Sequence, residues 1–237
     1  MQTFKDYEYK RPDMDAMKAT VRTLIEEFKA ASSVEEQSAV IEKINKERNA
    51  FSTQANLVYI RASIDTNDEF YQAERDHLDE VSPVAEEIIF EYYQELVKTP
   101  FRGELEEKWG TQLFDLAENQ IKGFSPEIME LMQKENKLTS EYSKLVASAQ
   151  IEFDGKTLTL AQLGPYSEST DRAVRKAARE TSANFFAGNA EKFDAIYDEL
   201  VKLRHKMAVK LGFKNYVELG YVNMNRVDYN AEMVAKF

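Results

Sequence analysis

The chain has 237 residues and a formal net charge of −11 at pH 7, with 43% hydrophobic and 31% charged residues. An acidic chain lacks the basic face that nucleic acids and anionic membranes require, so we expect neither as a partner. No apolar run approaches the ~20 residues that span a bilayer, and the N-terminal residues lack the apolar core of a signal peptide. The absence of cysteine excludes disulfides and thiolate metal sites and fits a cytoplasmic protein.

Helical periodicity dominates the first half of the chain, which also fits the low content of glycine and proline. Apolar residues at helical spacing predict a first helix over about 13–31. Ser33 and Glu36 have the spacing of a capping box and predict the start of a long second helix. Its apolar seam alternates steps of three and four residues: Ile41, Ile44, Arg48, Phe51, Ala55, Val58 and Ala62. Two such helices in succession predict an antiparallel hairpin.

Capping residues and prolines predict the next helices. Thr66 and Glu69 form a second capping-box pattern. The apolar stripe expected after it consists of Phe70, Ala73, His77 and Val81. Ser82-Pro83 predicts a new helix, because proline is tolerated at the first helical position, and this helix ends at Pro100. Residues 101–123 are predicted to be helical with interruptions at Gly103 and Gly110.

The hydrophobic period changes from 3.6 to 2 between about 150 and 160, after a helix predicted from Ser125 to about 149. Apolar residues alternate on both sides of Asp154-Gly155, and this pattern predicts a β-hairpin.

The remaining elements are predicted to be helical. Ser169 is the expected cap of the next helix, and Gly188-Asn189 restarts it. The buried stripe expected after this restart consists of Phe193, Ile196, Tyr197, Leu200, Met207 and Leu211. Gly212 ends this helix. A short helix is then expected from Asn215 to Gly220, and a last one from Asp228.

Residues 211–229 read Leu-Gly-Phe-x-Asn-Tyr-x-Glu-Leu-Gly-Tyr-x-x-Met-x-Arg-x-Asp-Tyr. This segment resembles the one that precedes the catalytic domain in the oligoendopeptidase F branch of the thimet oligopeptidase family. The expected hairpin followed by Asp171-Arg172-x-x-Arg175-x-x-Ala178 resembles the same family, in the same order along the chain. The resemblance implies a zinc metallopeptidase that cuts short peptides, with an elongated helical lobe as one wall of its substrate channel.

The zinc motif of that family, His-Glu-x-x-His, does not occur in this chain. A catalytic zinc needs three protein ligands, and the two histidines, His77 and His205, lie in unrelated contexts. Glu74 and His77 form one Glu-x-x-His pattern, but a di-iron carboxylate site needs two. We therefore predict no catalytic or metal-binding residue in this chain, with zinc present only in the complete enzyme. His77 is expected at the core or its boundary, and His205 on a solvated helix face.

Other charged and aromatic residues have alternative interpretations. The substrate-channel candidates come from the recognised segment and are Tyr221, Arg226 and Tyr229. Aromatic residues near helix ends also serve packing. Three arginines are predicted to line one helix face, where they could hold a peptide carboxylate or pair with nearby glutamates: Arg172, Arg175 and Arg179. Acidic pairs such as Glu86-Glu87 are expected on solvated helix faces.

We predict a mainly α fold: an elongated helical lobe with a helix hairpin near its N-terminus and one β-hairpin. Residues 1–122 are expected to form an N-terminal helical region, and residues 123–237 a second one leading towards a catalytic domain that this chain lacks. The chain ends inside an apolar helix, so we expect it to belong to a longer protein. Alone it should be inactive and should self-associate. A stand-alone acidic bundle that binds a partner helix or peptide stays open as the alternative.

Overall fold

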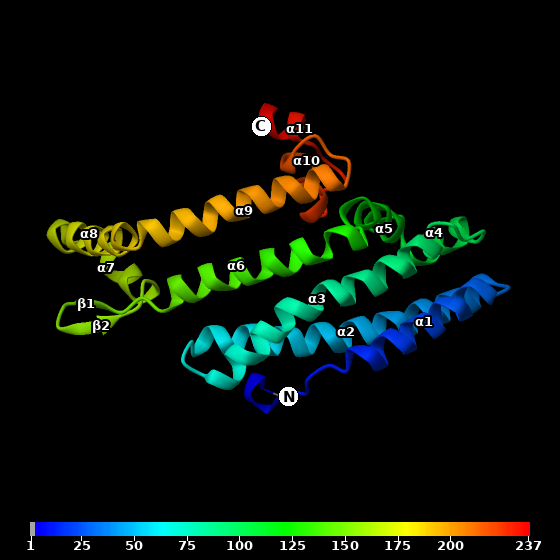
Figure 1. Cartoon of the computed structure of the whole chain (residues 1–237), viewed down its shortest axis with the longest axis horizontal. Helices are drawn as coiled ribbons and strands as arrows, with labels where there is room; N and C mark the ends of the chain where they lie inside the picture. The colour runs from blue at the N-terminus through cyan, green and yellow to red at the C-terminus, as the bar shows by residue number, and fades with distance from the viewer. Residues whose placement is uncertain (1–2) are drawn as a thin grey trace.

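The computed structural model describes residues 3–237, which form an elongated arrangement of helices with one small hairpin (Figure 1). The helices and strands of these residues are α1 (Met14–Ala30), α2 (Val34–Ile64), α3 (Glu69–Leu96), α4 (Arg102–Trp109), α5 (Gln112–Gly123), α6 (Met129–Ala147), β1 (Ile151–Phe153), β2 (Lys156–Leu158), α7 (Gly164–Ser167), α8 (Arg172–Gly188), α9 (Ala190–Lys210), α10 (Tyr216–Asn223) and α11 (Ala231–Lys236). The prediction of a mainly α lobe with one β-hairpin is confirmed. Each helix within the described range is too short or too polar to cross a membrane.

The N-terminal part is built on the antiparallel helices α1, α2 and α3 (Figure 1). The predicted apolar stripe of α1 is buried, with Val21 and Phe28 at its centre, and the seam of α2 is buried at Ile41, Ile44 and Val58. Val21, Phe28, Ile41 and Ile44 pack with apolar residues of α3, α4 and α5 in one core, whereas Val58 packs with Leu78 of α3 in a second cluster. The predicted helix hairpin is therefore confirmed, and α3 extends it to three helices.

The predicted break at Ser82-Pro83 is wrong, because α3 continues through Pro83 as one helix of 28 residues. Proline has no N–H for the carbonyl four residues earlier, which here belongs to Asp79. The Asn136 side chain of α6 donates a hydrogen bond to that carbonyl at 3.1 Å. A neighbouring helix thus satisfies the backbone acceptor that a proline inside a helix leaves free.

The predicted apolar stripe in the first half of α3 is also wrong, since Phe70 is 55% exposed. The helix instead buries three charged residues: Glu74, Arg75 and Asp79. Two of them have charge-assisted hydrogen bonds, which reduce the cost of burial. Glu74 accepts from Arg11 Nε at 2.9 Å, and Arg75 Nε donates to Ser140 Oγ at 3.0 Å. The start of α3 is set by Asp68, which accepts from Tyr71 N, rather than by Thr66.

The second half of the chain is organised around α6, which packs on α3 along one side and on α9 along the other (Figure 1). The predicted hairpin is confirmed: β1 and β2 pair antiparallel, with Ile151 opposite Leu158. Asp154 and Gly155 both have positive φ, as a two-residue hairpin turn of this type requires. In α9 the predicted buried stripe is confirmed at Ile196 and Met207, which are buried, but not at Tyr197, which is 70% exposed.

Three helix boundaries in the last third differ from those predicted. Gly220 lies inside α10, which ends instead at Asn223 and is followed by Asn225, a residue with φ of 52°. Asn225 N bonds the Val222 carbonyl and Arg226 N bonds the Tyr221 carbonyl, the hydrogen-bond pattern that usually requires glycine. Side chains of two other residues cap α8 and α11 in place of Ser169 and Asp228: Asp171 and Asn230.

Of three further glycines predicted to end or interrupt helices, two do so and one does not. Gly212 has φ of 86° and ends α9 as predicted, with Phe213 N bonded to the Ala208 carbonyl at 2.9 Å. Gly110, with φ of 83°, separates α4 from α5, whereas Gly103 lies inside α4 and interrupts nothing.

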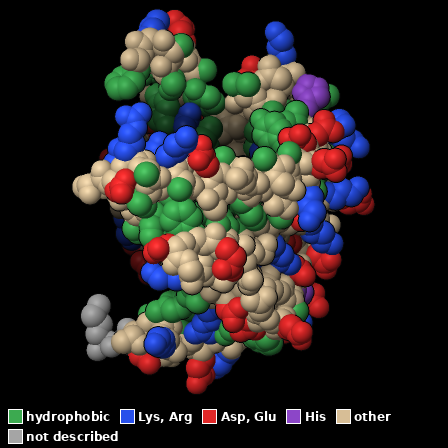
Figure 2. Space-filling model, turned by 90° about the vertical axis from the view of Figure 1, so that its left-hand side faces the viewer, with side chains coloured by type: hydrophobic (Ala, Val, Ile, Leu, Met, Phe, Trp, Pro, Cys, Tyr) green, Lys and Arg blue, Asp and Glu red, His purple; other side chains and the backbone are tan. Residues whose placement is uncertain are grey.

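One end of the lobe combines α8, the β-hairpin and the α2–α3 turn, and Figure 2 views this end directly. Charged side chains of both signs cover much of the surface there, with hydrophobic side chains exposed between them (Figure 2). Among the exposed hydrophobic residues of these elements are Ile64, Phe70 and Phe186.

Candidate functional site

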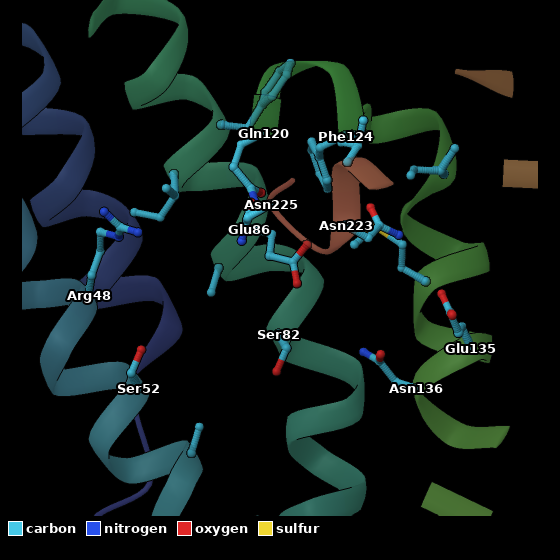
Figure 3. A pocket seen from close by; sticks show the side chains of 18 of the residues that line it. Arg48, Ser52, Ser82, Glu86, Gln120, Phe124, Glu135, Asn136, Asn223 and Asn225 are labelled. Atoms are coloured by element: carbon cyan, nitrogen blue, oxygen red, sulfur yellow. The ribbon is translucent and has the colours of Figure 1, made fainter. Parts of the chain in front are cut away.

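A cleft of about 840 Å³ lies over α3, between α2 on one side and α6 and α9 on the other, with α5 and α10 at one end (Figure 3). Its apolar lining includes Phe51, Ile89, Phe90, Phe124, Met132 and Leu219. Its polar lining includes Arg48, Ser52, Ser82, Glu86, Gln120, Glu135, Asn136, Arg204, Asn223 and Asn225. A concave apolar surface with a few convergent polar groups is typical of a ligand site.

The end wall of the cleft is held by side-chain hydrogen bonds from α5 to the last turn of α10 and to the residues that follow it. Asn119 Nδ2 donates to the Val222 carbonyl at 2.7 Å. Gln120 Nε2 donates to Asn225 Oδ1 at 2.9 Å. A Cβ on Gly123 would lie 2.8 Å from Val222 Cγ1, so α5 and α10 approach as closely as they do because residue 123 has no side chain.

Glu86 on α3 reaches into the middle of the cleft (Figure 3). Its side chain is exposed to solvent inside the cleft, yet walls surround it, and no hydrogen bond or ion pair to it is found among residues 3–237. The surrounding walls reduce the hydration of the carboxylate and raise the pKa of Glu86 to about 7, and the negative charge of Glu135 adds to the increase. This carboxyl group can therefore gain or lose a proton near neutral pH.

Glu135 on α6 and Arg204 on α9 form an ion pair across the cleft wall, with Oε1 2.6 Å from Nε. The Arg204 guanidinium also lies 5.5 Å from the centre of the Tyr216 ring on α10. A charge-assisted hydrogen bond and an aromatic face thus fix both side chains. The pair joins α6, α9 and α10 and leaves little net charge at this position.

Residues 4–124 match the family model of the peptidase M3 N-terminal domain. The chain belongs to the peptidase M3 family. Among solved structures it is similar to PZ peptidase A with an inhibitor, at 54% identity and a TM-score of 0.94, over 99% of this chain and 42% of that one. A comparison with curated proteins gave no significant match.

Two further solved structures are described as oligoendopeptidase F. One, from Bacillus anthracis strain Ames, is 52% identical with a TM-score of 0.94, over 99% of this chain and 43% of that one. The other is 49% identical with a TM-score of 0.95, over 100% of this chain and 42% of that one. The chain therefore spans about two fifths of the length of these M3 relatives. The predicted resemblance to oligoendopeptidase F is confirmed.

The residues predicted as substrate contacts of this M3 chain form one cluster. The Arg226 guanidinium lies 4.8 Å from the Tyr221 ring centre and 5.2 Å from that of Tyr229. The cleft is lined by their neighbours Val222, Asn223 and Asn225, so the cluster lies beside its end wall. A role in substrate contact stays a prediction for these three residues.

The donor set of the described residues does not fit the zinc of M3 peptidases. His77 is on α3 and the exposed His205 is on α9, with α6 between these helices (Figure 1). Within residues 3–237, no three His, Cys, Asp or Glu side chains are close enough together to hold a metal ion. A catalytic zinc requires three such ligands, so we derive no catalytic step from this chain.

The three arginines of α8 neither form ion pairs nor line the cleft within the described residues. Arg175 Nη1 donates to the carbonyls of Ser169 and Thr170, at 2.5 and 3.0 Å, and so fixes the loop before α8. Arg172 and Arg179 are exposed. The expected pairing with glutamates is therefore not observed.

Sequence reasoning missed Arg48, Glu86, Glu135 and Arg204, the charged residues of the cleft. Glu86 and Glu87 were expected on one solvated face, but the structure separates their environments. Glu87 lies 3.8 Å from Lys18 of α1, whereas Glu86 faces the cleft. In the sequence, Glu86 and Glu87 differ only in the face of α3 on which each lies. This difference identifies the cleft residue only when the helices that pack on each face of α3 are known.

Proposed function

We propose that this chain is the peptide-binding lobe of a zinc-dependent oligoendopeptidase that hydrolyses short peptides. Membership of the M3 family and the likeness to oligoendopeptidase F support a peptidase. The observation that carries the proposal is the cleft of about 840 Å³, which has room for a short peptide and is lined by apolar side chains and amides. In this proposal the cleft forms part of one wall of the substrate channel.

The hydrolytic groups would lie in a part of the enzyme that corresponds to the rest of the M3 relatives' length. The chain has no His-Glu-x-x-His, and its described residues do not bring three metal donors together. We therefore propose that the lobe binds and orients peptides, that a catalytic domain binds zinc, and that the lobe alone is inactive. Exposed apolar side chains in and after α10 and in α11 support contact with such a domain: Val217, Met224, Met233 and Val234.

The limited volume of the cleft would restrict substrates by size. An extended peptide can lie over α3 between α2 and α6, whereas a folded domain cannot enter a space of this volume. Amide side chains such as Asn136 and Asn223 can form hydrogen bonds with a peptide backbone of any sequence. The proposal thus accounts for a preference for short peptides without a preference for one side chain.

Photo-cross-linking tests this proposal. The 237-residue chain would be irradiated with a pentapeptide that carries a benzophenone, and the linked residues would be mapped by mass spectrometry. We expect links to cleft residues of α3 and α6, such as Ser82 and Thr139, and their loss with excess unlabelled peptide. Links confined to α8, or links that excess peptide does not reduce, would contradict the proposal. A folded protein carrying the same probe serves as the control and should not label the cleft.

A further inference from the structure

The cleft contains four charged side chains: Arg48, Glu86, Glu135 and Arg204. Glu135 and Arg204 neutralise each other through their ion pair at 2.6 Å. Among the described residues, neither Arg48 nor Glu86 has an ion pair. One carboxylate and one guanidinium therefore remain available to a ligand in the same cleft.

The environment of Glu86 favours a cationic ligand. The groups that act on its charge come from the helices packed around it: Glu135 on α6 repels it, and Arg204 on α9 is already paired with Glu135. An ammonium group beside Glu86 would replace lost hydration and offset the repulsion from Glu135. The neighbouring Glu87 contacts Lys18 outside the cleft and does not share this environment.

Arg48 on α2 is positioned for an anionic ligand (Figure 3). Its guanidinium lies 5.4 Å from the centre of the Tyr93 ring, and its Nη1 is 3.4 Å from Asn45 Oδ1. These neutral partners orient the guanidinium and leave its charge uncompensated. A guanidinium in this state binds a carboxylate through two parallel hydrogen bonds.

We infer that the cleft recognises unblocked short peptides by their two charged ends, with Glu86 binding the α-ammonium group and Arg48 binding the α-carboxylate. The inference rests on the proposed function and adds the ligand class to it. A zwitterionic peptide matches one free anion and one free cation in a single cleft. An internal segment of a long chain has neither end charge, so the same groups discriminate against it.

Isothermal titration of the 237-residue chain with four pentapeptides tests this inference. All four are built of alanine, glycine and phenylalanine: one with free ends, one N-acetylated, one C-amidated, and one N-acetylated with a central lysine. Each is titrated against the unmodified chain, Glu86→Gln, Arg48→Gln and the control Glu87→Gln. Circular dichroism confirms that each variant is folded.

We expect the free-ended peptide to bind each of the variants Glu86→Gln and Arg48→Gln about tenfold more weakly than it binds the unmodified chain. Each variant loses the charge-assisted hydrogen bonds to one end of the peptide. N-acetylation should weaken binding by a similar factor and remove the effect of Glu86→Gln, while C-amidation should remove the effect of Arg48→Gln. Glu87→Gln should bind all four peptides as the unmodified chain does.

Several results would overturn the inference. Equal binding of free-ended and blocked peptides shows that end charges are not recognised, and the proposed function then stands without it. Restoration of tight binding by the central lysine shows that Glu86 selects a basic side chain instead of the terminus. A failure of all four peptides to bind contradicts the proposed function as well.

Discussion

Asn136 on α6 donates its side-chain amide to the backbone carbonyl of Asp79 on α3, at 3.1 Å. This is the carbonyl for which Pro83, four residues later, has no N–H. One turn earlier on α6, Gln133 Nε2 donates to the Glu80 carbonyl at 2.8 Å. Two amides of α6 thus support α3 where proline weakens it, and they place Glu86 on a continuous helix that faces the cleft.

A double-mutant cycle measures this support. We expect Asn136→Leu to lower the free energy of unfolding by about 1–3 kcal/mol, because it leaves the Asp79 carbonyl without a partner. In the Pro83→Ala background residue 83 regains its N–H, so the same substitution should cost less. Urea unfolding of the four proteins at pH 7 gives the coupling. Equal costs in the two backgrounds would show that Asn136 acts independently of the proline.

Gly123 is predicted to set the distance between α5 and α10. In Gly123→Ala the added Cβ would lie 2.8 Å from Val222 Cγ1, and we expect a loss of about 1–3 kcal/mol from overpacking. Gly103→Ala is the matched control, because nothing lies within 4 Å of its Cβ position in α4. It should increase stability by about 0.4–1 kcal/mol. Thermal unfolding of both variants checks the prediction, and similar effects at the two positions would contradict it.

The raised pKa of Glu86 predicts a pH dependence of stability. Because its pKa is about 7 when folded and near its ordinary value of about 4.3 when unfolded, the protonated form favours folding. This stabilisation is complete below the unfolded pKa and is lost as pH rises through about 7. Glu86→Gln should therefore be more stable than the unmodified chain at pH 8, by about 1 kcal/mol once screening by water in the cleft is allowed for.

The two proteins should have nearly equal stability near pH 4.5, where Glu86 is protonated when folded. Denaturant unfolding at several pH values between 4.5 and 8 follows the difference. Glu87→Gln serves as the control, since Glu87 lies outside the cleft. A difference that is constant with pH would contradict the assigned pKa.

Much of the helical fold could be predicted from local sequence signals. Gly212 ends α9 through its positive φ, and Asp154-Gly155 forms the hairpin turn, because each effect depends on a residue's own backbone freedom. The continuation of α3 through Pro83 could not be predicted, since its partner Asn136 lies 53 positions away in the sequence. The cleft could not be predicted either, because its walls come from helices that are far apart in the sequence. Glu86 differs from Glu87 only in the helices that surround it.

The division into residues 1–122 and 123–237 stays a prediction, and so does the cytoplasmic location. The assignment of Tyr221, Arg226 and Tyr229 to substrate contact is likewise a prediction. In the structure the Arg226 guanidinium lies over the rings of both tyrosines. The sequence indicated only that the three residues are near each other along the chain.

Self-association follows from the exposed apolar surface. Met233 and Val234 on α11 are 54% and 46% exposed, and Val217 on α10 is 60% exposed. Apolar side chains left in water favour association, so light scattering should show oligomers at high concentration. Met233→Glu combined with Val234→Glu should shift the population towards monomer. A clean monomer of the unmodified chain at the same concentration would contradict the prediction.

A single assay separates peptide binding from hydrolysis. The 237-residue chain is mixed with an internally quenched, free-ended pentapeptide and zinc, and both binding and cleavage are followed. We expect the peptide to bind and to be recovered intact, because the described residues do not assemble three metal donors. Hydrolysis of the peptide by this chain, abolished by a zinc chelator, would contradict it.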